Sequence, residues 1–294
     1  PLGLVSCVTP PEPAPKPVIV VNTYPLEFIV REVAGPLAEI QVMPTPTPEA
    51  PELSAAQVTQ LQSATLVFYQ SGLSPAIDAV LAGADMSRVV DTATLVGELP
   101  VDTDYAQNTE GNPVPGTQMD PYTWLNPANM GLFTNVLADR LVKLLPANTT
   151  TIGQASNALV ERFGELDAAF LAALTDCERR EFLTSYPAFR YLASAYGLTQ
   201  LSVPGLDSQS EPTAELRAQV SELVGEYGLT TLLVYPAGDE TQSDNLSATL
   251  GLEVALLDPV ETITAASPGS DYLQVMYTNL EVLRLANGCS WQTH

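Results

Sequence analysis

The chain has 294 residues, and 46% of them are hydrophobic, which is enough apolar material for one large core or two ordinary ones; we expect two domains. Its 11 lysines and arginines stand against 34 aspartates and glutamates, which gives a net charge of −23. This charge repels phosphate backbones and anionic lipid headgroups, so the composition argues against nucleic acid as a partner.

The first residues resemble the end of a bacterial lipoprotein signal. The stretch "LVSC" ending at Cys7 resembles a lipobox, in which the signal is cut before a cysteine that then carries lipid. The following "VTPPEPAPKP" is proline-rich and is typical of an extended, solvated stalk. We therefore expect residues 1–17 to be a trimmed lipoprotein signal and a stalk, with a lipid anchor at Cys7. That anchor would place the protein outside the cytoplasm, in the periplasm or at the cell surface.

The two remaining cysteines would lie in an oxidising compartment. Cys177 precedes the strand-like "EFLTSY", and Cys289 follows the last helical pattern. A disulfide between them would tie the chain end to the second half of the protein. Two separate buried thiols are the alternative, because the sequence does not give the distance between them.

Strand and helix patterns alternate in the first half of the chain. Continuous β-branched runs such as "VIVVN" are typical of buried parallel strands, and the segments between them have helical spacing with serine caps and glycine ends. The expected strands are 18–22, 38–43 and 65–70, and the expected helices are 24–35, 54–64 and 74–83. Residues 97–118 are rich in Gly, Pro, Asp and Asn and predict a long surface loop.

Helical spacing returns at residue 126, and a long amphipathic helix follows. Its apolar residues recur every three or four positions: Ile152, Ala155, Leu159, Phe163, Leu166, Phe170 and Leu174. Strands and helices then alternate again to the chain end. The pattern predicts an α/β protein of two lobes, each a mostly parallel sheet flanked by helices, joined by one long linking helix. The lobes would be 18–147 and 177–294, with the linking helix at 148–176.

Several motifs, in order, resemble those of one known family. They include "NTYPLEFIVREVAG", "LSAAQVTQLQSATLVFYQSG", "DPYTWLNPAN", "TSYPAFRYLASAYGL" and "LLDPV". Together they are similar to the zinc- and manganese-type (ZnuA-like) metal solute-binding lipoproteins of bacterial ABC importers. The resemblance covers nearly all of residues 18–288. It implies two lobes, a rigid linking helix and one metal ion held in the cleft between the lobes.

The resemblance also implies which side chains hold the metal, although three of them depart from the family pattern. Glu49 stands at the first ligand position, where histidine is usual, and Glu52 lies close enough to compete with it. Tyr122 and Tyr186 replace the next two histidines, and Asp258 stands at the last position.

All four side chains present oxygen. Such a set suits a hard, highly charged cation that can ionise tyrosine far below its usual pKa of about 10, and Fe³⁺ fits best. The family resemblance favours Mn²⁺ or Zn²⁺ instead, but zinc prefers imidazole and thiolate, and the single histidine is His294 at the chain end. The metal identity therefore stays open at this point.

The function implied by the resemblance is capture of one metal ion for delivery to an ABC import permease, by a protein that we expect to be a monomer. The alternative is a surface adhesion or binding lipoprotein on the same scaffold that has lost metal binding, with the two tyrosines packing the cleft. An enzyme has little support, because no internal histidine exists to activate a serine and no carboxylate pair has a recognisable spacing.

Replacing Cys7 with serine should release the protein from membranes, because the acylated thiol would be lost. The measurement is the partition of the full-length precursor between membrane and soluble fractions. Unchanged partitioning of the Cys7→Ser protein would rule out this anchor.

Overall fold

A computed structural model describes residues 15–43, 52–99, 119–202, 213–235 and 247–290. The lipobox-like segment, Glu49, His294 and most of the loop predicted at 97–118 lie outside these residues. Within them, every helix is too short or too polar to cross a membrane.

The first lobe contains a sheet of four parallel strands in the order β2-β1-β3-β4. Its strands are β1 (Val18–Val21), β2 (Glu39–Val42), β3 (Leu66–Tyr69) and β4 (Val89–Asp91). Its helices are α1 (Tyr24–Ala34), α2 (Ala55–Ser63) and α3 (Pro75–Leu81). Three strands agree with the sequence prediction, whereas the three-residue β4 was not predicted because so short a run carries no periodicity.

The helix starts in this lobe follow from local chemistry. The Ser54 hydroxyl accepts from the Gln57 N–H, and the Gln57 side chain accepts from the Ser54 N–H, so α2 begins with a reciprocal capping box. Ser74 caps α3 in the predicted way through the Ile77 N–H. Both helix starts were therefore readable from the sequence.

The second lobe repeats the arrangement of the first. Its parallel sheet has the order β6-β5-β7-β8. Its elements are β5 (Glu181–Thr184), α6 (Arg190–Ala195), β6 (Thr199–Ser202), α7 (Ala214–Tyr227), β7 (Thr231–Val234) and β8 (Glu253–Leu256). In both sheets the first strand is central, so each lobe brings the carboxyl ends of its strands to one edge.

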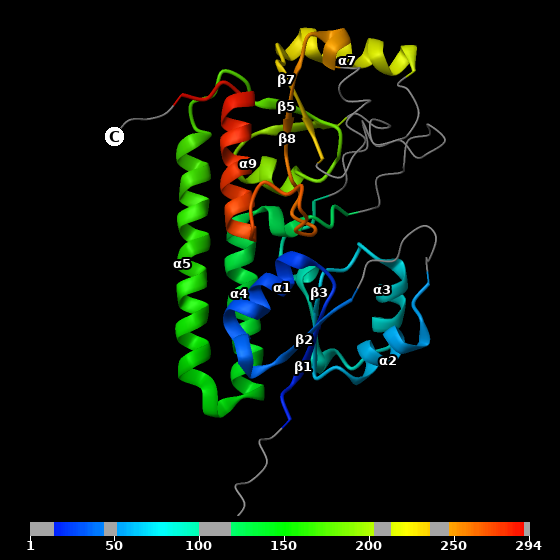
Figure 1. The fold of residues 1–294 in the computed structure, drawn as a ribbon, viewed down its shortest axis with the longest axis vertical. Coiled ribbons are helices and arrows are strands. Elements are labelled where there is room, and N and C mark those ends of the chain that lie inside the picture. Colours follow the sequence, from blue (N-terminus) through cyan, green and yellow to red (C-terminus); the bar gives the residue numbers. More distant parts are fainter. Residues whose placement is uncertain (1–14, 44–51, 100–118, 203–212, 236–246, 291–294) are drawn as a thin grey trace, which may run out of the picture.

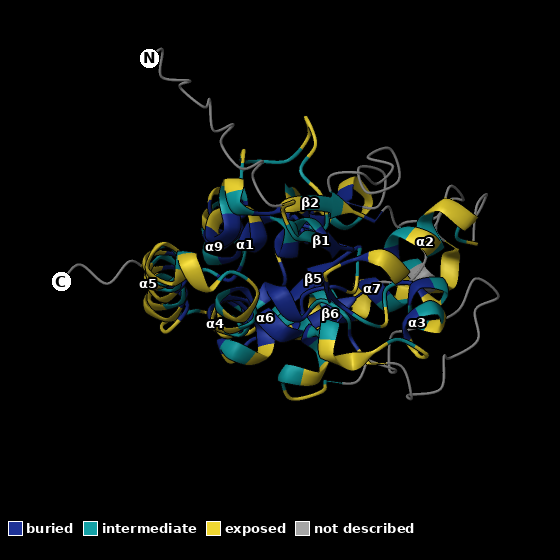
Figure 2. Cartoon of the chain, turned by 90° about the horizontal axis from the view of Figure 1, so that it is seen from below, coloured by how far each residue is buried: buried dark blue, intermediate teal, exposed yellow. Residues whose placement is uncertain are grey.

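Three helices connect and cover the two sheets: α4 (Pro127–Leu144), α5 (Thr149–Ala173) and α9 (Tyr272–Ala286). Figure 1 shows α5 running along one side of the molecule past both lobes. Its periodic apolar residues, among them Ile152, Phe163 and Phe170, are buried, whereas its other faces are exposed (Figure 2). The predicted fold class is confirmed. The lobe boundaries of the sequence analysis stay a prediction, although α5 falls within the range assigned to the linking helix.

The apolar core is continuous between the lobes. One cluster of buried residues includes side chains from β1, α4, α5, β5 and α9. At its centre the rings of Phe28, Phe163 and Tyr272 pack within 5.6–6.3 Å of one another. Trp124 is fully buried in the same cluster. A shared core favours lobes that move little relative to each other.

Cys177 and Cys289 form a disulfide with an S–S distance of 2.03 Å, across a sequence separation of 112 residues. The backbones of the two cysteines also form an isolated antiparallel bridge. The carbonyls of Asn287 and Gly288 accept from the N–H groups of Arg179 and Glu178 next to it. The bond thus joins the end of α9 to the start of the second lobe, as the sequence suggested it could.

Removing this disulfide by the paired change Cys177→Ala and Cys289→Ala should lower the free energy of unfolding. The chain-entropy model gives a loss of about 4 kcal/mol for so long a loop. The measurement is denaturant unfolding of the oxidised protein and of the double variant, with and without reductant. If reductant destabilises the double variant as much as the wild-type protein, the stabilisation does not come from this bond.

Candidate metal centre

Tyr122 and Tyr186 meet between the lobes although 64 residues separate them. Their hydroxyl oxygens are 2.5 Å apart, and their rings pack edge to face at 5.9 Å. Tyr122 comes from the segment before α4 in the first lobe, and Tyr186 follows β5 in the second. The structure therefore brings together two of the four side chains predicted to bind metal.

Glu261 is a third oxygen donor at this place, and the sequence analysis did not single it out. The Tyr186 hydroxyl donates to Glu261 Oε1 at 3.1 Å. Because a phenol has a single proton, the Tyr122 hydroxyl must then donate to Tyr186. A hydrogen-bonded chain thus runs from Tyr122 through Tyr186 to Glu261. The signal that could have revealed Glu261 is its position three residues after Asp258, in the same turn after β8.

Tyr122 is held by buried polar groups at the strand ends of the first lobe. Its N–H donates to Asp120 Oδ1 at 2.7 Å, so Asp120 orients the start of this loop. The next residue, Thr123, donates to Gln70 Oε1 at 2.6 Å. Gln70 directly follows β3 and exchanges two hydrogen bonds with Asn22, which directly follows β1. The loop is thus fixed to two central strands.

Tyr186 is held in a corresponding way in the second lobe. Gln200 of β6 donates to the Tyr186 carbonyl at 3.0 Å and to Thr184 Oγ1 at 2.9 Å. The Oε1 atom of Gln200 accepts from the Phe189 N–H. One buried amide therefore fixes both sides of the loop that carries Tyr186.

Asp258 occupies the turn that positions Glu261. Its Oδ1 accepts from the Val260 N–H at 2.8 Å, and its backbone exchanges two hydrogen bonds with the Asn279 side chain on α9. Val260 is fully buried at a φ of 57°, which is a strained conformation for a β-branched residue. In these contacts the Asp258 carboxylate stabilises the turn, whereas Glu261 reaches the tyrosines. Direct metal ligation by Asp258 stays a prediction.

The first predicted ligand position is Glu49, with Glu52 as its competitor. Glu49 lies outside the described residues, while the competing Glu52 is exposed at the surface before α2. Among the residues that the structure describes, no three His, Cys, Asp or Glu side chains form a group able to hold a metal ion. The donors that converge are therefore two phenols and one carboxylate.

Burial and the nearby carboxylate oppose ionisation of both phenols. Burial, followed by the negative charge of Glu261, raises the pKa of Tyr122 and of Tyr186 above the usual value. Burial also raises the pKa of Asp120 to about 7, against the opposing effects of the Tyr122 N–H and the Arg190 charge. Without a bound cation, both phenols are neutral at physiological pH.

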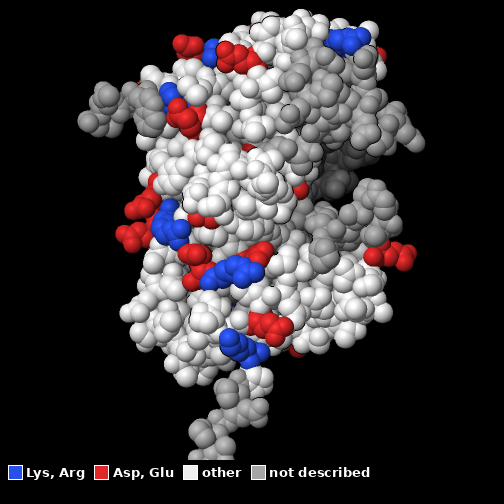
Figure 3. Space-filling view, viewed as in Figure 1, with Lys and Arg blue, Asp and Glu red and all other residues white. Residues whose placement is uncertain are grey.

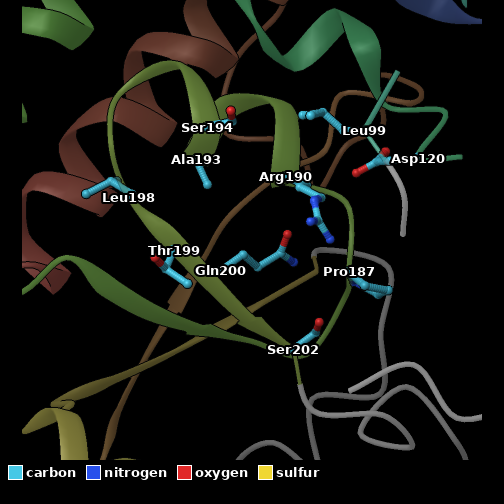
Figure 4. A pocket seen from close by; sticks show the side chains of 10 residues that line it. All are labelled: Leu99, Asp120, Pro187, Arg190, Ala193, Ser194, Leu198, Thr199, Gln200 and Ser202. Atoms are coloured by element: carbon cyan, nitrogen blue, oxygen red, sulfur yellow. The ribbon is translucent and has the colours of Figure 1, made fainter. Parts of the chain in front are cut away.

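A separate pocket of about 260 Å³ includes residues that neighbour the two tyrosines in sequence. Asp120, Pro187, Arg190 and Gln200 are among its lining residues (Figure 4). Asp120 and Gln200 are also the side chains that hold the loops of Tyr122 and Tyr186. Neither tyrosine lines this pocket, so it is distinct from the place where the two tyrosines meet.

Comparison with known proteins decides the family. Residues 19–286 match the family described as ZnuA, zinc-uptake complex component A, periplasmic. The chain belongs to the ZnuA family. This description agrees with the predicted resemblance, with a location outside the cytoplasm, and with a binding component of an uptake complex instead of an enzyme.

Relatives of this ZnuA-family chain include the zinc-binding lipoprotein AdcA of Streptococcus pneumoniae strain ATCC BAA-255 / R6, which is 27% identical over 294 residues. That alignment covers 96% of this chain and 58% of the relative, so the chain spans little more than half of that protein. The Zn(II)-bound ZnuA-like domain of Streptococcus pneumoniae AdcA is similar in structure, with a TM-score of 0.77, 26% identity, and coverage of 92% of this chain and 99% of the domain. The metal-dependent lipoprotein YcdH of Bacillus subtilis shares the fold, with a TM-score of 0.78, 20% identity, and coverage of 92% of this chain and 99% of that one.

Two substitutions separate the two roles considered for Asp258. In Asp258→Asn the amide oxygen can still accept from the Val260 N–H, whereas Asp258→Ala removes the acceptor and should cost about 1–3 kcal/mol of stability. If Asp258 mainly holds the turn, Asp258→Asn keeps its metal affinity and Asp258→Ala loses it.

The measurements are denaturant unfolding and metal competition, with the exposed Glu253→Gln on β8 as a control. Equal loss of affinity in Asp258→Asn and Asp258→Ala would instead identify a direct ligand.

Proposed function

We propose that this protein captures one metal ion between its lobes, through Tyr122, Tyr186 and Glu261, and delivers it to an ABC import permease. The observation that carries the proposal is the convergence of three oxygen donors from both lobes. The hydroxyls of the two tyrosines are 2.5 Å apart, and Glu261 lies 3.1 Å from Tyr186. Glu49, Glu52 and Asp258 remain candidates for completing the coordination.

The donor chemistry favours a harder cation than zinc. Zinc sites in proteins are mostly built from imidazole and thiolate, whereas the two aromatic donors here are phenols. Two phenolates with a carboxylate would place three negative charges around one ion. We therefore propose Fe³⁺ as the preferred metal, with Mn²⁺ and Zn²⁺ as the competitors suggested by family membership.

The hydrogen-bonded chain supports a preorganised site. Its three oxygens are already gathered by hydrogen bonds to both lobes, so little rearrangement is needed for one cation to contact all of them. A cation would take the place of the phenolic protons that now hold the oxygens together. Burial raises the phenol pKa values, so a weakly polarising ion would displace these protons less readily than Fe³⁺.

Anchoring and delivery complete the proposed function. We propose that Cys7 carries the lipid anchor, in keeping with the description of the AdcA relative as a lipoprotein, and that the protein acts as a monomer. The same scaffold without metal binding, acting as a surface adhesion protein, is the alternative. It has its own support in the hydrogen-bonded chain, since the three side chains already satisfy one another without a metal ion.

Loading purified protein with Fe³⁺ should produce a visible colour, because ferric tyrosinate absorbs light by ligand-to-metal charge transfer. Tyr122→Phe and Tyr186→Phe should each weaken or shift this band and reduce Fe³⁺ affinity by at least about tenfold, the equivalent of 1.4 kcal/mol. Absorption spectroscopy and elemental analysis, with competition among Fe³⁺, Mn²⁺ and Zn²⁺, make the measurement.

Tyr277→Phe is the matched control, because Tyr277 is 44% exposed on α9 and outside the site. Tight Zn²⁺ binding that neither site substitution affects would overturn the ligand assignment. Failure to bind any of the three metals would favour the adhesion alternative.

A further inference from the structure

A third tyrosine, Tyr235, lies directly against the pair. It follows the last residue of β7, and its ring stacks on that of Tyr186 with centroids 5.1 Å apart and an interplanar angle of 20°. Tyr122 meets the same Tyr186 ring edge to face. The Tyr186 ring is therefore confined by one neighbour from the first lobe and one from the second.

The backbone keeps Tyr235 in this position. Its N–H donates to Ser185 Oγ at 3.4 Å, and the Ser185 N–H donates to the Leu233 carbonyl at 2.8 Å. The end of β7 is thus joined to the segment next to Tyr186 on two sides. The stack is part of a fixed connection between two adjacent strand ends.

The Tyr235 hydroxyl is influenced by nearby carboxylates, whereas the Tyr235 ring contacts the Tyr186 ring. Burial, followed by the negative charges of Glu261 and Asp258, raises the pKa of Tyr235. The structure records no hydrogen bond between the Tyr235 hydroxyl and the other two phenols among the residues it describes. The contact that links Tyr235 to the metal centre is therefore the stacked ring.

We infer that Tyr235 is a positioning residue that sets the selectivity of the metal centre, an inference that rests on the proposed function. By fixing the plane of the Tyr186 ring, it fixes the spacing between the Tyr186, Tyr122 and Glu261 oxygens. A rigid set of donors discriminates among cations by size and charge, whereas a loose one adapts to several. The ring carries this role and the hydroxyl does not.

Two substitutions test the inference. Tyr235→Phe keeps the stacked ring and should leave Fe³⁺ affinity and the charge-transfer band as in the wild type. Tyr235→Leu removes the stack and should weaken Fe³⁺ binding about two- to tenfold, shift the band, and narrow the preference for Fe³⁺ over Mn²⁺. Tyr277→Leu, an exposed change on α9, is the control for loss of a tyrosine ring elsewhere.

A second measurement does not need metal binding. In metal-free protein labelled with 3-fluorotyrosine, the ¹⁹F resonance of Tyr186 is identified by its absence from Tyr186→Phe. The Tyr186 resonance should stay in place in Tyr235→Phe and in Tyr277→Leu, because an aromatic ring remains at position 235. The Tyr186 resonance should move in Tyr235→Leu, because the ring current at position 235 is lost. Thermal unfolding checks that each variant is folded.

The outcomes separate this inference from the proposed function. An unmoved Tyr186 resonance in Tyr235→Leu would overturn the positioning role, whether or not metal binds. Equal loss of Fe³⁺ affinity in Tyr235→Phe and Tyr235→Leu would also overturn it, because the hydroxyl would then act as a donor. Absence of metal binding by the wild-type protein would instead count against the proposed function, while the ¹⁹F shift would still test the stack.

Discussion

The site depends on one buried side chain, Trp124, which links the two lobes next to the tyrosines. Its indole N–H donates to the Pro259 carbonyl at 2.8 Å, and its own carbonyl accepts from the Tyr272 hydroxyl at 2.6 Å. These bonds hold the turn that contains Glu261 against the loop that contains Tyr122. The rings of Tyr122 and Trp124 also pack edge to face, with centroids 5.3 Å apart. The Glu261 carbonyl, which accepts from the Tyr24 N–H, adds a second link between the lobes. These contacts, together with the hydrogen bonds that hold each tyrosine loop, fix the separation of the donors.

Parallel topology explains why the donors come from such distant parts of the sequence. In both sheets the strands run in one direction, so the residues that follow β5, β7 and β8 lie at one edge of the second lobe. Tyr186, Tyr235 and Glu261 occupy those three positions. The first lobe contributes Tyr122 from a loop bound to the ends of β1 and β3 through Gln70. Figure 3 shows acidic and basic groups side by side at several places on one face of the molecule. Arg31 with Glu27 and Arg162 with Glu32 are two of the ion pairs of the described residues.

The family description and the side chains that meet between the lobes differ in ligand chemistry. The family description concerns zinc uptake, but the three donors that converge here are oxygens. The fold is fixed by buried strands and by the shared core, neither of which depends on the identity of the donors. A scaffold of this kind can therefore keep its architecture while the side chains that meet between the lobes change.

The sequence by itself determined what depends on neighbouring residues. Buried β-branched runs, three-and-four spacing in α5 and serine caps predicted the strands, the linking helix and the helix starts, because each is a local pattern. The ordered motifs predicted that Tyr122 and Tyr186 meet between the lobes, and their hydroxyls do meet. Only the tertiary structure decided that Cys177 and Cys289 are bonded, that Glu261 reaches Tyr186 while the Asp258 carboxylate bonds within its turn, and that Tyr235 stacks on Tyr186. These outcomes depend on distances across the fold and on the backbone of one strained turn at Val260, which no spacing of residue types encodes.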